Sequence, residues 1–107
     1  MPKYFLSNKA VEDLSNIWNY SYKTWFENQA DKYYELLIDC CENISKNPKI
    51  GKNCQEIDNN ILGYKSLHHN IFYQVIKENE IKVVRILHES MDLKNRIRES
   101  KTTLNEI

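Results

Sequence analysis

Five side chains in the second half of this sequence have the chemistry that acid–base or phosphate catalysis requires. They are Lys65, His68, His69, Arg85 and His88. A metal-free ribonuclease needs a general base, a general acid and cations that stabilise the phosphate charge of the transition state. Each candidate also has a structural interpretation. Lys65 can be a solvated strand residue, Arg85 one half of a structural ion pair, and His88 a hydrogen-bonding group at a chain turn.

Metal and nucleophile chemistry are disfavoured by residue spacing. His68 and His69 are adjacent and would face opposite sides of a strand, and Cys40 and Cys41 would diverge by about 100° on a helix. The sequence contains neither a C-x-x-C nor an H-E-x-x-H motif, no nucleophile elbow frames its serines, and its 2 glycines are not clustered into a phosphate-binding loop. We therefore expect no bound metal and no cofactor.

Length and composition indicate one soluble globular domain. The 107 residues make room for one hydrophobic core, and 41% hydrophobic with 28% charged residues is an ordinary balance. No apolar run approaches the roughly 18 residues of a membrane span, and no secretory signal is evident, so we expect a cytoplasmic protein.

The 3 cysteines do not suggest a disulfide framework. The 15 basic and 15 acidic residues balance, which disfavours a general nucleic-acid binder.

The first half of the chain predicts a strand followed by two helices. Residues 3–7 are apolar and aromatic, as in a strand, and Ser7 or Asn8 can cap the helix that follows. Asn28 is a good cap for a second helix that ends at Asn47-Pro48. Because only a few residues connect the helices, we expect an antiparallel hairpin. The predicted buried face of the first helix repeats every three or four residues and comprises Val11, Leu14, Ile17, Trp18, Ser21 and Trp25.

Aromatic residues on this helix also allow a second interpretation. Trp18, Tyr22 and Trp25 are spaced like core residues. A helical hairpin over a small sheet nevertheless leaves a groove or an open sheet edge, where partner peptides commonly bind.

The second half of the chain changes to the pattern of β-strands. After a connecting loop at 48–60, short polar breaks at His69-Asn70 and 78–80 separate three β-rich segments, which predicts a three-stranded antiparallel meander. The segments are 62–68, 71–76 and 81–87.

The elements together predict an α+β fold of order β-α-α-β-β-β(-α), with a helical hairpin packed on a small antiparallel sheet. Asp92 can cap the short final helix. We expect a single domain at 1–98, and a C-terminal tail at 99–107.

Several strings, taken in order, resemble the ParE branch of the RelE/ParE toxin superfamily. In the helical hairpin they are Glu12-Asp13-Leu14, Ile17-Trp18-x-Tyr20, Trp25 and Gln29-Ala30, followed by Asn47-Pro48-Lys49-Ile50-Gly51. In the closing strands they are Ile71-Phe72-Tyr73-Gln-Val and Val84-Arg85-Ile86-Leu87-His88-Glu89-x-Met91-Asp92, which ends in the LH-x-x-MD turn of ParE-type toxins. The resemblance covers about residues 3 to 98.

The resemblance implies a RelE/ParE-like fold and the toxin of a type II toxin–antitoxin pair, which causes growth arrest until a small cognate antitoxin, ParD-like in this branch, binds it. ParE-type toxins inhibit DNA gyrase, whereas RelE-type toxins cleave mRNA on the ribosome with several basic residues of the sheet. Lys65 matches that basic pattern, but Asn70 and Ser90 fall near positions where arginine is expected, and Arg96 near an aromatic position. An incomplete set of cations should cost several orders of magnitude in rate.

We therefore predict a gyrase inhibitor that acts by binding, without catalytic residues, membrane attachment or sequence-specific DNA contacts of its own. The predicted target-binding residues lie at the end of the last strand and just beyond it, where an exposed Met and Arg suit an interface. They are Arg85, His88, Met91, Asp92 and Arg96. His88 and Asp92 have an alternative role in fixing the turn.

Two other functions remain open from the sequence. One is a ribosome-dependent mRNA endonuclease that uses Lys65, Arg85 and a histidine. The other is an inactive toxin homologue that only binds its antitoxin.

Overall fold

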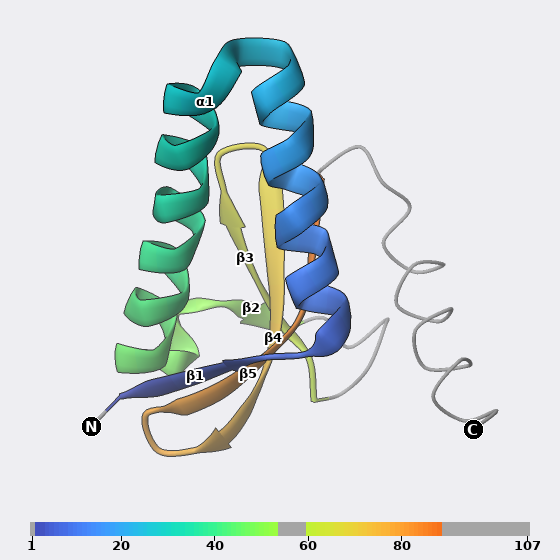
Figure 1. Ribbon diagram of the computed structural model, residues 1–107. Coiled ribbons are helices and arrows are strands. Elements are labelled where there is room, and N and C mark those ends of the chain that lie inside the picture. Colours follow the sequence, from blue (N-terminus) through green and yellow to red (C-terminus); the bar gives the residue numbers. More distant parts are fainter. Residues whose placement is uncertain (1, 54–59, 89–107) are drawn as a thin grey trace, which may run out of the picture.

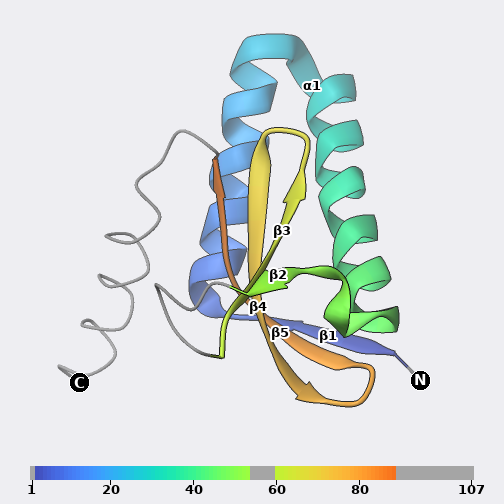
Figure 2. The same cartoon turned by 180° about the vertical axis from the view of Figure 1, so that it is seen from behind.

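A computed structural model describes residues 2–53 and 60–88 as two layers, with a helical hairpin on one face of a sheet (Figures 1 and 2). The elements are β1 (Lys3–Leu6), α1 (Asn8–Lys46), the short 3-10 helix η1 (Pro48–Ile50), β2 (Lys52–Asn53), β3 (Leu62–Ser66), β4 (His69–Lys77) and β5 (Glu80–His88). The predicted α+β fold is confirmed. Cys54, the predicted final helix and the tail at 99–107 lie outside the described residues.

The helical hairpin is formed by α1, which reverses direction at Phe26. Residues 8–25 form its first arm and residues 27–46 its second. Ser7 caps the first arm as predicted, because its hydroxyl accepts a hydrogen bond from the Ala10 N–H at 3.0 Å. The predicted cap at Asn28 is wrong, since helical backbone already resumes after Phe26. A single residue with a positive φ makes the reversal, so no longer connection is needed.

The sheet has 5 strands in the order β1-β5-β4-β3-β2. β3, β4 and β5 form the predicted antiparallel meander. β1 pairs in parallel with β5, which makes the whole sheet mixed. β2 adds a short edge strand in a region that was predicted to be loop.

The turn between β3 and β4 differs from the prediction. It is made by Leu67 and His68, while His69 and Asn70 belong to β4. Leu67 adopts a φ of 53° there. The two-residue hairpin turns that match the twist of the strands require a positive φ at their first central residue, which is Leu67 here. Burial of the His69 ring explains why a polar break in the sequence became part of a strand.

The core lies between the helical hairpin and the sheet. It comprises Ala10, Leu14, Leu37, Cys41, Ile44, Ile71, Tyr73, Ile81, Val83 and Ile86. The predicted buried face of the first arm is wrong at two positions, because Trp25 is 53% and Val11 49% exposed. Figure 1 gives the reason for Trp25: the hairpin extends past the β3–β4 turn, so no sheet lies beneath its tip.

Tyr73 fixes η1 to the sheet from the centre of β4. Its fully buried hydroxyl donates to the Pro48 carbonyl at 2.7 Å and accepts from the Gly51 N–H at 2.9 Å. A Cβ atom at position 51 would clash with this hydroxyl, so the site requires glycine.

Candidate partner-binding site

A pocket of about 430 Å³ opens between the first arm of α1 and the end of β5. Aromatic side chains form most of its wall: Tyr20, Trp25, Tyr33, His68, His69 and His88. Asp13, Asn16, Ile17, Ser21 and Ile86 complete the lining. A concave, largely apolar surface with a few polar groups is the usual form of a ligand or anchor-residue site.

All 3 histidines of the chain meet at this pocket. The ring centroids of His69 and His88 are 5.2 Å apart and nearly perpendicular, and those of His68 and His88 are 6.4 Å apart. The Tyr33 hydroxyl and the His69 Nδ1 share a hydrogen bond of 2.5 Å. Within residues 2–53 and 60–88, no group of three or more His, Cys, Asp or Glu side chains is arranged to hold a metal ion.

Arg85 is held in a buried ion pair behind the pocket. Its Nε and Nη2 atoms donate to the two carboxylate oxygens of Asp13 at 2.8 and 3.0 Å. The backbone N–H of Ile86 donates to the same carboxylate at 3.0 Å. Each side chain of the pair is only 11% exposed. This is the structural role that the sequence allowed for Arg85, and a contact between Arg85 and a target stays a prediction.

The remaining candidates from the sequence are dispersed. His88 lies half-buried at the end of β5, where it lines the pocket. Lys65 is exposed on β3 and pairs in register with Asn70 of β4. Met91, Asp92 and Arg96 lie outside the described residues.

Sequence reasoning missed Tyr20 and Tyr33 as pocket residues and left Trp25 open between the core and a partner-binding groove. Their helical spacing is the same for a core residue and for a residue that lines a pocket. The reversal at Phe26, which brings both arms to one side of the pocket, carries no glycine or proline that would have marked it.

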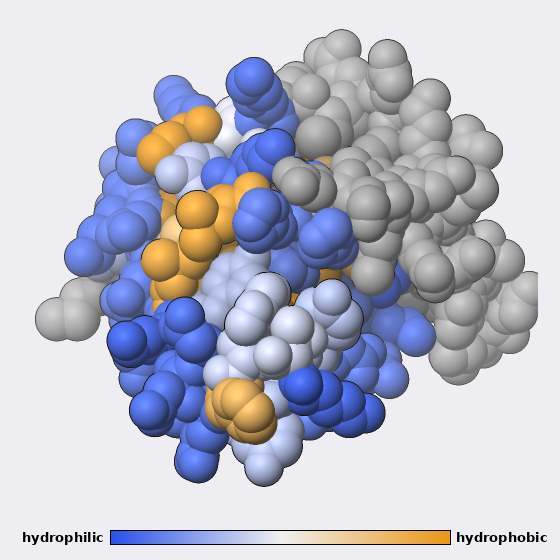
Figure 3. Space-filling model, turned by 90° about the horizontal axis from the view of Figure 1, so that it is seen from above, coloured by the Kyte–Doolittle hydropathy of each residue, from blue (hydrophilic) through white to orange (hydrophobic). Residues whose placement is uncertain are grey.

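The reversal itself carries an exposed aromatic cluster, the aromatic tip, which consists of Tyr20, Tyr22, Trp25 and Phe26. Their exposed fractions are 66%, 47%, 53% and 78%. Phe26 has a φ of 70° and a ψ of 178°, a conformation that glycine normally occupies and that costs other residues about 1–3 kcal/mol. Figure 3 looks onto this end of the molecule, where orange and pale side chains gather among hydrophilic ones.

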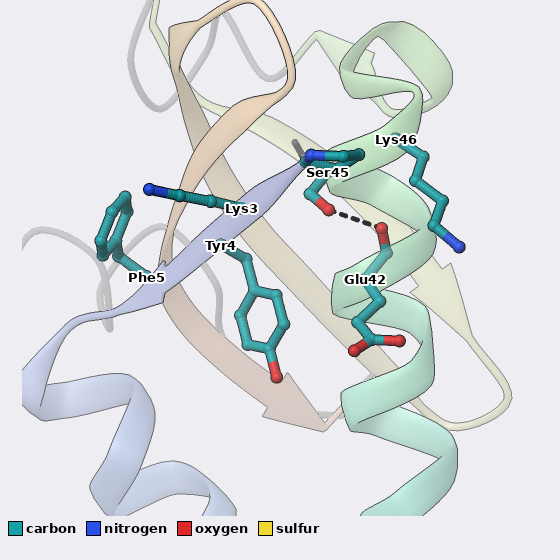
Figure 4. A pocket seen from close by; sticks show the side chains of 7 residues that line it. Lys3, Tyr4, Phe5, Glu42, Ser45 and Lys46 are labelled. Atoms are coloured by element: carbon teal, nitrogen blue, oxygen red, sulfur yellow. Dashed lines mark hydrogen bonds between the residues drawn. The ribbon is translucent and has the colours of Figure 1, made fainter.

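A second cavity of about 430 Å³ lies beside β1 and the end of α1 (Figure 4). Burial raises the pKa of Tyr4 in its wall, and the nearby Cys41 and Glu42 raise it further. The Lys3 and Lys46 side chains point away from each other, so the charged groups do not converge on one ligand. The aromatic pocket is therefore the better candidate for a binding site.

Comparison with known proteins identifies the family. The ParE toxin family of type II parDE toxin–antitoxin systems matches residues 4–93. The chain belongs to this family. It is 38% identical over 94 residues to toxin ParE1 of two Mycobacterium tuberculosis strains, covering 85% of this chain and 93% of the relative. It is 36% identical over 95 residues to toxin ParE1 of Caulobacter vibrioides, covering 86% and 94%.

A solved structure supports the same fold. The chromosomal ParDE toxin–antitoxin system from P. aeruginosa contains a chain that superposes with a TM-score of 0.69 at 16% identity, covering 82% of this chain and 96% of that one. The resemblance predicted from the sequence is thus confirmed, and the chain is a ParE-family toxin. No helix among the described residues is long and apolar enough to cross a membrane.

Proposed function

We propose that this ParE-family toxin acts by binding, that DNA gyrase is its target, and that a cognate ParD-like antitoxin neutralises it. The observation that carries the proposal is the nature of the pocket. Its wall is aromatic, and the one arginine of the described residues is already held by a carboxylate. Such a surface suits binding to apolar side chains of another protein. In protein–protein interfaces, aromatic residues contribute a large share of the binding free energy.

The alternative of ribosome-dependent mRNA cleavage has less support. Phosphoryl chemistry requires cations aimed at the developing charge. The Arg85 guanidinium faces Asp13 with two of its N–H groups, and Lys65 stands exposed on β3. The inactive-homologue alternative predicts antitoxin binding without growth arrest.

The target surface in this proposal begins at His88 and continues through Met91, Asp92 and Arg96. His88 supports it by lining the pocket at the described end of β5. Arg96→Ala tests the remainder: folding should be unchanged and inhibition of the target weaker, and unchanged inhibition removes Arg96 from the surface.

The function is tested with purified toxin, gyrase holoenzyme, relaxed plasmid and ATP, beside a ribosome-dependent mRNA cleavage assay. We expect loss of supercoiling or trapped cleaved DNA, with intact mRNA. Equimolar antitoxin should restore supercoiling. Cleaved mRNA with unaffected gyrase would refute the proposal and make Lys65 and Arg85 the residues to mutate. Inactivity in both assays, with antitoxin binding retained, would favour the inactive homologue.

A further inference from the structure

The aromatic tip combines two features that folding alone does not favour. Its four side chains are exposed at the far end of the hairpin, and Phe26 holds a backbone conformation that glycine would adopt without strain. Phe26 also has the most exposed large apolar side chain of the described residues. Strained backbone and exposed apolar side chains are both typical of functional surfaces.

Ring contacts hold three of the four tip residues, Tyr20, Tyr22 and Trp25, in place. Trp18 donates from its indole Nε1 to the Asp31 carboxylate at 3.0 Å, which links the two arms below the reversal. The Trp18 and Tyr22 rings stack at 5.3 Å, and the Tyr20 and Trp25 rings meet edge to face at 6.4 Å. A preorganised aromatic surface loses little conformational entropy when it binds.

The charged residues beside the tip indicate which class of partner it can bind. Lys23 and Glu27, the charged residues that flank Trp25 and Phe26 in the sequence, are both exposed and of opposite sign. The two charges offset each other, so these flanking residues give the tip no net positive charge to attract the phosphates of nucleic acids or anionic lipids. An apolar surface of a protein is the complementary partner.

The position of the tip next to the pocket indicates which protein surface it contacts. Tyr20 and Trp25 belong to the tip and also line the pocket that His88 closes. Aromatic side chains are thus continuous from the end of β5 to the reversal of α1. We infer that the aromatic tip is the outer part of the gyrase-binding surface and that Phe26 is one of its anchors. This inference rests on the proposed function and extends its surface from β5 onto the helical hairpin.

The decisive variant is Phe26→Gly. It removes the aromatic side chain and permits the positive φ without strain, so the fold should keep or gain thermal stability. Inhibition of supercoiling should nevertheless require about tenfold more toxin, the effect of losing about 1.4 kcal/mol from one aromatic anchor. A purely structural role for Phe26 would move stability and inhibition in the same direction.

Tyr34→Ala is the matched control, because Tyr34 is an aromatic of the second arm that is 38% exposed and belongs neither to the tip nor to the lining of the pocket. It should inhibit gyrase like the wild type. Trp25→Ala should weaken inhibition as Phe26→Gly does. Full inhibition by Phe26→Gly, with active wild type, overturns the inference and leaves the proposed function standing.

Two further results would show that the tip does not bind gyrase. If the wild-type toxin leaves gyrase unaffected, the proposed function fails and the inference falls with it. If light scattering shows a wild-type dimer that Phe26→Gly converts to monomer, the tip binds a second copy of the chain, which also overturns the inference. We expect Phe26→Gly to leave the oligomeric state unchanged.

Discussion

Replacement of Asp13 should destabilise this fold more than any surface substitution. Its carboxylate accepts three hydrogen bonds, two from Arg85 and one from the Ile86 N–H, at 2.8 to 3.0 Å. The contact joins the first arm of α1 to β5. Asp13→Ala leaves a guanidinium charge and a backbone N–H without these acceptors, in a place where the Arg85 side chain is only 11% exposed.

The expected cost follows from these contacts. Removing one partner of a buried ion pair costs about 3–5 kcal/mol, and a buried unsatisfied N–H about 1–3 kcal/mol. Because both groups can relax toward water, we expect about 4 kcal/mol for Asp13→Ala in total. Asp13→Asn keeps an oxygen for the Ile86 N–H and should cost about 1–2 kcal/mol less. For a domain of this size, a loss of about 4 kcal/mol lowers the Tm by roughly 15–30 °C.

Urea denaturation followed by circular dichroism measures these differences. The Asp13→Ala/Arg85→Ala double variant completes a mutant cycle and should show a coupling of about 1–3 kcal/mol, because the second substitution removes the uncompensated charge. Glu12→Ala is the control, since Glu12 is exposed and pairs with the exposed Lys9. A cost below about 1 kcal/mol for Asp13→Ala would mean that solvent screens the pair like a surface one, and would refute this reasoning.

Three more predictions follow from local features of the fold. Tyr73→Phe should cost about 1–3 kcal/mol in urea denaturation, because the Pro48 carbonyl and the Gly51 N–H both lose a buried partner; a neutral effect would mean that water replaces the hydroxyl. Leu67→Gly should raise the Tm slightly, because glycine adopts the φ of 53° without strain and Leu67 is 63% exposed; a clear fall in Tm would instead reveal an unrecognised contact. Burial, and then the neighbouring Cys40, raises the pKa of the Cys41 thiol from 9.0 to about 12. The folded state therefore holds this proton more tightly, and its contribution to stability is complete below pH 9 and decreases as the pH rises toward 12. Stability of the wild type should consequently fall more steeply than that of Cys41→Ala between pH 9 and 11, and equal slopes would contradict the assignment.

Periodicity was sufficient to predict β1, the helical hairpin and the meander, but not η1, β2 or how far the hairpin extends beyond the sheet. The hairpin and the meander follow from apolar spacing and turn residues, and residue type narrowed the first cap to Ser7 or Asn8, of which the structure shows Ser7. Trp25 has the same spacing as Leu14, yet one is 53% and the other 3% exposed, because only the lower part of the arm faces the sheet. No local pattern contains that information, since it depends on where β3 and β4 turn.

The pocket was unpredictable for a similar reason. His69 and Arg85 were singled out by residue type, but their hydrogen-bond partners lie far along the chain. Asp13 is 72 residues from Arg85, and Tyr33 is 36 residues from His69. A single sequence gives no distance between such residues. It could therefore predict an ion pair for Arg85 but not that Asp13 is the partner.

The pairing of β1 with β5 has a consequence for the order in which the toxin is made. β1 leaves the ribosome well before β5, yet the two strands are hydrogen-bonded neighbours, and Ser7 donates from its hydroxyl to the Val84 carbonyl 77 residues later. At a synthesis rate of about 5–20 residues per second, β1 waits roughly 4–15 s for β5. One wall of the pocket comes from α1 and the other from β4 and β5. A growing chain that has not yet reached residue 88 therefore contains the complete helical hairpin but lacks the β5 wall of the pocket, so the pocket forms only after β5 has been synthesised.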